Sequence, residues 1–207
     1  MHISSFTRKK AIQRGFTLIE TIVAVMILSI AVTGPLYLAS RTLRVSQDAR
    51  NELIASHLAM EGIEVIHNIR DNNSADDTSM TRDEWMENPP LQIVGSCATG
   101  CTIDITESSA SDVWDQFVLK ACASGDCSND GKVYRHKTTG LYRQDNSAFS
   151  SDWEFTGFTR WIEVEGIDGP NPLREVEVRV FVTYTSVTGA TLTTALTEHL
   201  FNWFPTL

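Results

Sequence analysis

An apolar run near the start of the chain constrains the fold more than any other feature. Residues 16–39 are 24 consecutive positions with a single charged side chain, that of Glu20. A helix of this length extends roughly 36 Å, enough to cross a bilayer core of about 30 Å. Because few soluble helices are apolar on every side, we expect a membrane-spanning segment and not a buried core helix.

The flanks of this run bear on whether it is a cleaved secretory signal. Residues 1–15 carry four basic residues and no acidic one, as the first region of such a signal does. However, the run exceeds the usual apolar region of 7–15 residues, and no A-x-A-like site directly follows it; Ala39-Ser40 is a weak candidate. Basic residues stand on both sides of the span, and their count leans slightly towards a cytoplasmic amino terminus.

Glu20 identifies the segment more closely. A carboxylate in an apolar span is costly unless it is paired, so it marks a functional position. The string RGFTLIE, residues 14–20, resembles the type III signal of type IV pilins and type II secretion pseudopilins. In that family a prepilin peptidase cuts after a glycine, and the new amino-terminal phenylalanine is N-methylated. The resemblance implies cleavage between Gly15 and Phe16, methylation of Phe16, and an assembly role for Glu20.

The resemblance also implies how the span assembles. Glu20 would pair with the amino group of Phe16 in a neighbouring subunit, which offsets the cost of the carboxylate and sets the register between helices. The span would leave the lipid and pack in a filament core. Gly34-Pro35 predicts a kink, because proline removes a backbone donor and clashes with the preceding turn; many pilins have a proline near this depth.

Residues 40–70 predict a second, amphipathic half of the same helix. Apolar residues recur at spacings of three and four from Leu53 to Ile69, and DNNS at 71–74 predicts the end. We therefore expect one helix from 16 to about 70, after a cleaved basic leader (1–15) and before a globular head (71–207). The helix comprises a filament-core half (16–39) and an amphipathic half (40–70). The stretch 58–73 resembles minor subunits of the same superfamily.

The last third of the chain predicts antiparallel strands. Residues 173–184 alternate strictly, with valines and Tyr184 on one side and Glu, Arg and Thr on the other. We expect strands at 155–164, 173–184 and 191–203, and shorter ones at 132–135 and 141–143. A sheet of about four strands would bury its apolar face on the helix stripe, giving an α+β head like that of pilins. The ending FNWFPTL is either core or a partner-facing edge, and we favour core.

Four cysteines allow three kinds of chemistry. The chemistries are disulfide bonds, zinc binding and free thiols, and the residues are Cys97, Cys101, Cys122 and Cys127. Their spacings are close to those of zinc ribbons. An extracytoplasmic head favours disulfides, because thiols oxidise there. Sequence alone leaves the pairing open. We favour the local pairs Cys97–Cys101 and Cys122–Cys127, because each flanks a turn-like stretch.

Other polar residues give weak metal signals. Acidic side chains in 71–90 could hold calcium but match no defined calcium loop, so we favour a solvated loop: Asp71, Asp76, Asp77, Asp83 and Glu84. Asp130-Gly131 predicts a turn. His57 and His67 lie ten residues apart on the helix, too far to share a metal ion. We expect no cofactor and no metal.

Charge and motifs narrow the function. The chain has a net charge of −9, hence −13 outside the leader, so we expect no nucleic-acid partner. No G-x-S-x-G, H-E-x-x-H or G-x-G-x-x-G string is present, and we expect no enzyme. The prediction is a minor pilin or pseudopilin of a type IV pilus or type II secretion-type filament. The alternatives are a single-pass surface binding module and a zinc-binding or enzymatic ectodomain.

The resemblance also implies partners and a location. The partners would be the prepilin peptidase, other pilin or pseudopilin subunits, an assembly platform membrane protein and membrane lipid. The chain would span the cytoplasmic membrane once with an extracytoplasmic head, and it would enter a surface or periplasmic filament after assembly.

Overall fold

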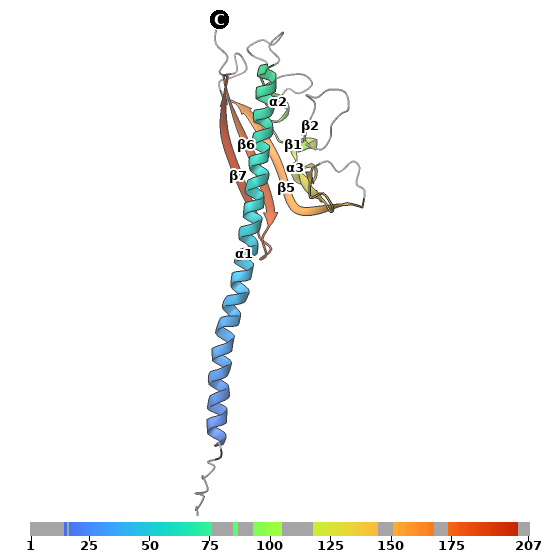
Figure 1. Ribbon diagram of the computed structural model, residues 1–207. Coiled ribbons are helices and arrows are strands. Elements are labelled where there is room, and N and C mark those ends of the chain that lie inside the picture. The colour runs from blue at the N-terminus through green and yellow to red at the C-terminus, as the bar shows by residue number, and fades with distance from the viewer. Residues whose placement is uncertain are drawn as a thin grey trace, which may run out of the picture. The chain divides into compact units, whose positions relative to one another are not determined.

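A computed structural model describes residues 15, 17–75, 85–86, 93–104, 118–144, 151–167 and 174–202. The fold is α+β, with one long helix and a seven-stranded antiparallel sheet (Figure 1). The chain divides into two compact units, Met1–Ser46 and Gln47–Leu207. The helices are α1 (Leu18–Ala75), α2 (Ile93–Ser96) and α3 (Cys127–Asp130), with a 3-10 turn η1 (Ala123–Gly125). The strands are β1 (Cys101–Asp104), β2 (Val118–Ala121), β3 (Lys132–His136), β4 (Tyr142–Arg143), β5 (Trp153–Gly166), β6 (Glu175–Thr185) and β7 (Thr191–Phe201).

The long strand β5 organises the sheet. Along one edge it pairs with β6, from Phe158↔Tyr184 to Gly166↔Val176, and β6 pairs in turn with β7. Along the other edge β5 pairs with β3 and, at Ile162, with β1. The expected sheet of about four strands is therefore wrong. The strands that it lacked are β1 and β2, which have four residues each and no clear alternation.

The helix α1 ends later than expected. The DNNS stretch does not end it, since the helix continues to Ala75. Asp, Asn and Ser favour helix ends but are tolerated in a last turn, and helix boundaries are the least certain part of a sequence prediction.

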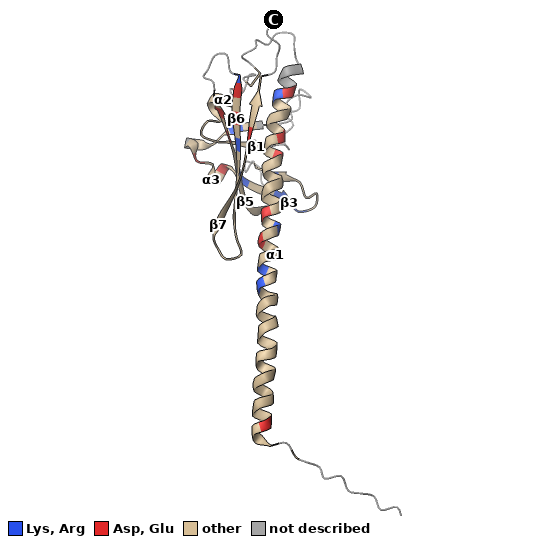
Figure 2. Cartoon of the chain, turned by 90° about the vertical axis from the view of Figure 1, so that its left-hand side faces the viewer, with Lys and Arg blue, Asp and Glu red and all other residues tan. Residues whose placement is uncertain are grey.

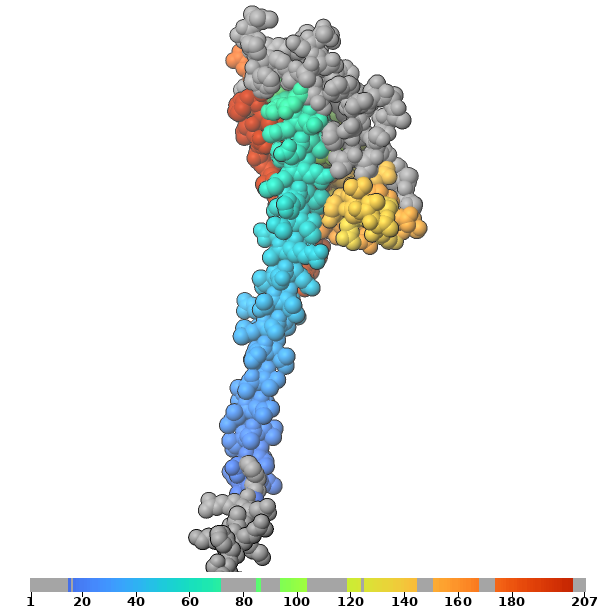
Figure 3. All heavy atoms as spheres, in the orientation of Figure 1, coloured from blue at the N-terminus to red at the C-terminus, as the bar shows by residue number. Residues whose placement is uncertain are grey.

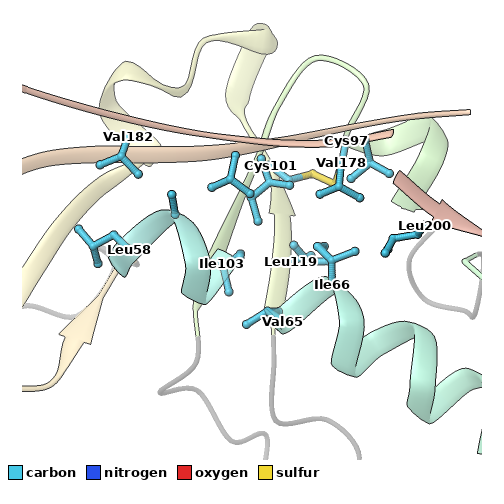
Figure 4. Packing of buried hydrophobic residues seen from close by; sticks show 14 of the residues in the cluster. Leu58, Val65, Ile66, Cys97, Cys101, Ile103, Leu119, Val178, Val182 and Leu200 are labelled. Carbon is cyan, nitrogen blue, oxygen red and sulfur yellow. A yellow bond between two sulfur atoms is a disulfide. The ribbon is translucent and has the colours of Figure 1, made fainter. Parts of the chain in front are cut away.

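The head is built on the contact between the second half of α1 and the inner face of the sheet. The buried helix residues follow the predicted spacing, and they pack against the valines of β6, which alternate as the sequence indicates (Figure 4). The helix contributes Ala55, Leu58, Ala59, Val65 and Ile66 to this core. The stripe begins later than expected, because Leu53 is 59% exposed.

The carboxyl end of the chain was expected to enter the core. Phe201, the last residue of β7, is instead 56% exposed, so this part of the expectation is wrong. Residues 203–207 lie outside the described part of the chain.

One buried cation joins the helix to four separate parts of the head. Arg160 of β5 is only 2% exposed. Its Nη1 donates to the carbonyl of Leu58, at 3.1 Å, and to Glu61 Oε2, at 2.8 Å. Its Nε donates to Oε1 of Gln144 at 2.9 Å. Gln144 in turn donates to the carbonyl of Gly131 and accepts from the amide of Ile103.

Gly62 lets the helix approach the sheet closely. A Cβ at this position would lie 2.9 Å from Cγ1 and 3.1 Å from Cγ2 of Val180, whose side chain is fully buried in β6. Such distances require the helix or the strand to shift.

We predict that Gly62→Ala destabilises the protein by about 1–3 kcal/mol through overpacking, despite the better helix propensity of alanine. The matched control is Gly34→Ala, in the same helix, where an added Cβ meets nothing within 4 Å. Denaturant unfolding of both variants measures the difference. Equal midpoints would contradict the close-approach role of Gly62.

Candidate functional site

The amino-terminal end of α1 contains the residues that the sequence singled out. Thr17 caps the helix: its carbonyl accepts from the amides of Glu20 and Thr21, at 3.1 and 3.2 Å, and its hydroxyl lies 3.4 Å from the amide of Glu20. Glu20 lies in the first turn, where the helix dipole favours a carboxylate. No basic side chain in the described part of the chain pairs with it. Gly15 is exposed, and Phe16 lies outside the described residues.

The first half of α1 exposes apolar side chains on every side. All residues described between 17 and 46 are exposed, among them Leu18, Ile19, Ile27 and Ile30. Between 18 and 39 the helix carries one charged side chain, and Figure 2 shows this acidic position near the start of α1. Figure 3 shows the side chains of this segment on the visible face. Among the described helices, α1 alone is long and apolar enough to cross a membrane.

Five Ser and Thr hydroxyls of this half bond within the helix. Each of the five donates to a backbone carbonyl three or four residues earlier: Thr21 to Leu18, Ser29 to Val25, Thr33 to Ile30, Ser40 to Tyr37 and Thr42 to Leu38, over 2.8–3.2 Å. Such bonds hide polar atoms that would be costly in hydrocarbon. Glu20 is the one charged side chain between 18 and 40, and a carboxylate in such an apolar segment calls for a partner. Isolated Ser and Thr residues in an apolar run are the sequence signal of this pattern.

Pro35 lies inside the helix, as expected. Helix α1 continues on both sides of it, and an added Cβ on Gly34 would meet nothing within 4 Å. The kink at Gly34-Pro35 stays a prediction.

The cysteines form two disulfides, Cys97–Cys101 and Cys122–Cys127, which are the local pairs that the sequence favoured. The two loops meet at Gly100, whose carbonyl accepts from the amide of Cys122 at 3.0 Å. All four cysteines are buried.

The second disulfide loop continues into a capped helix. Asp126 caps α3 by accepting from the amide of Ser128 at 2.9 Å, and this bond lowers the pKa of the Asp126 carboxyl. Asp130 ends α3, and Gly131 follows it as the expected turn. The loops therefore brace one end of the sheet.

The remaining metal candidates give no site. Among the described residues no three His, Cys, Asp or Glu side chains gather in a way that could hold a metal ion. Of the acidic residues considered for calcium, Asp71 binds Arg70 at 2.8 Å, and the other four lie outside the described residues. His57 is exposed, whereas Nε2 of His67 lies 3.0 Å from Glu198 Oε1.

Comparison with known proteins identifies the amino-terminal segment. Residues 10–34 match the prokaryotic N-terminal methylation motif, the signature of the prepilin-type segment of type IV pilins and pseudopilins. The match includes Gly15, Phe16 and Glu20. No curated protein and no solved structure matches the chain. The chain thus carries a pilin-type precursor segment, and its apolar helix fits a membrane-anchored, single-pass protein.

We predict that Gly100→Ala disrupts the junction of the disulfide loops. Gly100 has a φ of +117°, and a Cβ there would lie 2.5 Å from Cys127 Sγ. The change should cost more than about 2 kcal/mol, by strain and by overlap, and should increase the number of reactive thiols. Gly140→Ala is the control, because its φ of +75° is also positive but an added Cβ there meets nothing within 4 Å. Thermal unfolding and thiol titration compare the two, and equal losses would refute the overlap.

Proposed function

We propose that this chain is a structural, non-enzymatic subunit, a minor pilin or minor pseudopilin, of a type IV pilus or a type II secretion-type filament. The prepilin peptidase cuts between Gly15 and Phe16 and methylates Phe16. The motif match at residues 10–34 is the observation that carries this proposal.

The side chains of the span suit a helix that moves from lipid into a bundle of apolar helices. Its self-satisfied hydroxyls and apolar surface are compatible with lipid and equally with other apolar helices. The precursor therefore inserts with 16–39 in the cytoplasmic membrane and its head outside. An assembly platform membrane protein then delivers the span to neighbouring pilin or pseudopilin subunits.

The carboxylate of Glu20 supports an assembly step in which a neighbouring subunit supplies a cation. An isolated carboxylate on an apolar helix is costly in lipid and in a helix bundle, and a cation beside it offsets that cost. The methylated amine of Phe16 in a neighbouring subunit supplies such a cation. Glu20 would then determine the axial register between subunits.

We predict that the protein made with a prepilin peptidase begins at Phe16 and carries one added methyl group. Intact and peptide mass spectrometry measure both. Gly15→Ala should block cleavage, because a side chain there obstructs the protease, whereas Gly34→Ala should not. A retained leader, or cleavage near Ala39, would rule out the pilin-type pathway and favour an anchored or secreted module.

We also predict that Glu20→Ala is cleaved normally but enters filaments at least tenfold less, because the register contact is lost. The matched control is Glu64→Ala, another exposed glutamate of α1 that should assemble as the wild type does. Quantitative blotting of sheared filaments against the membrane fraction gives the ratio. Normal incorporation of Glu20→Ala would end the register role while leaving the processing result intact.

A further inference from the structure

Two arginines follow the apolar span of α1 at a short distance. Residues 21–47 contain Arg41 and Arg44 and no acidic residue, and the first carboxylate after Glu20 is that of Asp48. Figure 2 shows basic positions on α1 after its long uncharged stretch. Both arginines are exposed. This end of the span is therefore cationic, although the whole chain is acidic.

Neither guanidinium has a carboxylate partner in the described part of the chain. The ion pairs there join other residues. Asp48, the nearest carboxylate along the helix, accepts instead from the amide of Val187 at 2.9 Å. A guanidinium stays charged in proteins, and its planar fork of donors matches the paired oxygens of a carboxylate or a phosphate. Arg41 and Arg44 thus present two full charges to an external anion.

The helix places these two charges on one face. Tyr37, Arg41 and Arg44 follow one another at spacings of four and three, so their side chains share a stripe of α1. Tyr37 is 66% exposed. Arg50 is the next basic residue, but it stands six positions after Arg44, which is not a helical repeat. One ligand can therefore contact Arg41 and Arg44 together, without Arg50.

The depth of the arginines relative to the span selects the ligand. Arg41 lies roughly 3 Å beyond Ala39 along the helix axis, and Arg44 roughly 7.5 Å beyond it. The headgroup layer is about 5–8 Å thick on each side of the hydrocarbon core. Helical side chains also lean towards the amino terminus, which here is towards the lipid. Arg50 lies roughly 16 Å beyond Ala39, outside that layer.

We propose that Arg41 and Arg44 bind the phosphate of an anionic phospholipid, with Tyr37 at the interfacial depth that tyrosine favours. This proposal rests on the membrane insertion of residues 16–39 proposed above, but not on cleavage after Gly15. A phosphodiester supplies the oxygens that two guanidinium groups require. An anionic headgroup adds no cation of its own, whereas a choline headgroup does, so anionic lipid is preferred. The contact holds this end of the span at one depth until the subunit leaves the lipid.

The experiment places the full mature chain, which lacks the basic leader, in lipid nanodiscs of equal parts phosphatidylglycerol and phosphatidylcholine. Native mass spectrometry of the released protein counts the lipids that stay bound. The wild type should retain phosphatidylglycerol in excess. Arg41→Gln and Arg44→Gln should each lower that excess roughly fivefold, which corresponds to about 1 kcal/mol for each charge. The matched control is Arg50→Gln, an exposed arginine of the same helix that should leave the excess unchanged.

Other outcomes would assign the arginines elsewhere. Equal retention of the two lipids by the wild type, or an equal loss in Arg50→Gln, would overturn the proposal. Displacement of the lipid by inorganic phosphate would assign the arginines to a soluble anion. Poor filament incorporation of Arg41→Gln with an unchanged lipid ratio would assign them to carboxylates of a neighbouring subunit. Failure of the wild type to insert would overturn the proposed membrane anchorage as well, whereas insertion without lipid preference overturns the phosphate site alone.

Discussion

The buried guanidinium of Arg160 is the interaction on which the rest of the head depends. A charge withdrawn from water costs several kcal/mol unless its surroundings compensate it. Here Glu61 supplies the countercharge, while the carbonyl of Leu58 and the side chain of Gln144 accept its other hydrogen bonds. Satisfying one cation therefore requires the helix, β5 and the residue after β4 to be in place together.

The hydrogen bonds of Arg160 also explain why the short strand β4 and the close helix–sheet contact at Gly62 are kept in place. Strand β4 has only two residues, yet Gln144 directly after it is held by the carbonyls of Gly131 and Arg160 and by the amide of Ile103. The helix meets the sheet one turn after Leu58, and Gly62 allows that contact at close range. Hydrophobic burial supplies most of the stabilisation, but it is non-directional. The hydrogen bonds of Arg160 select one arrangement of the packed elements.

Local patterns made much of this fold predictable. The alternation from Val176 to Tyr184 and the local cysteine pairs were readable because their evidence lies within a few residues. The cleavage and methylation segment was readable for the same reason. Strands β1 and β2 were missed because four residues show no period.

Other features depend on pairing between distant segments. Arg160 is on the buried side of an alternating strand, and partners distant in the chain, among them Glu61 and Gln144, make that position tolerable. The aromatic pairs Tyr134–Phe155 and His136–Trp153 likewise require the register of β3 against β5, and the sequence does not display that register.

In the amino-terminal half of α1, apolar packing and the pairing of a polar group would contribute differently to assembly. Its apolar side chains can gain free energy by packing against many partners, and its hydroxyls bond within the helix and so favour none. Neither group distinguishes one axial offset between helices from another. A single buried polar group does, because every offset that leaves it unpaired is penalised. Glu20 is the one charged side chain of the span, which is why the proposed register contact is assigned to it.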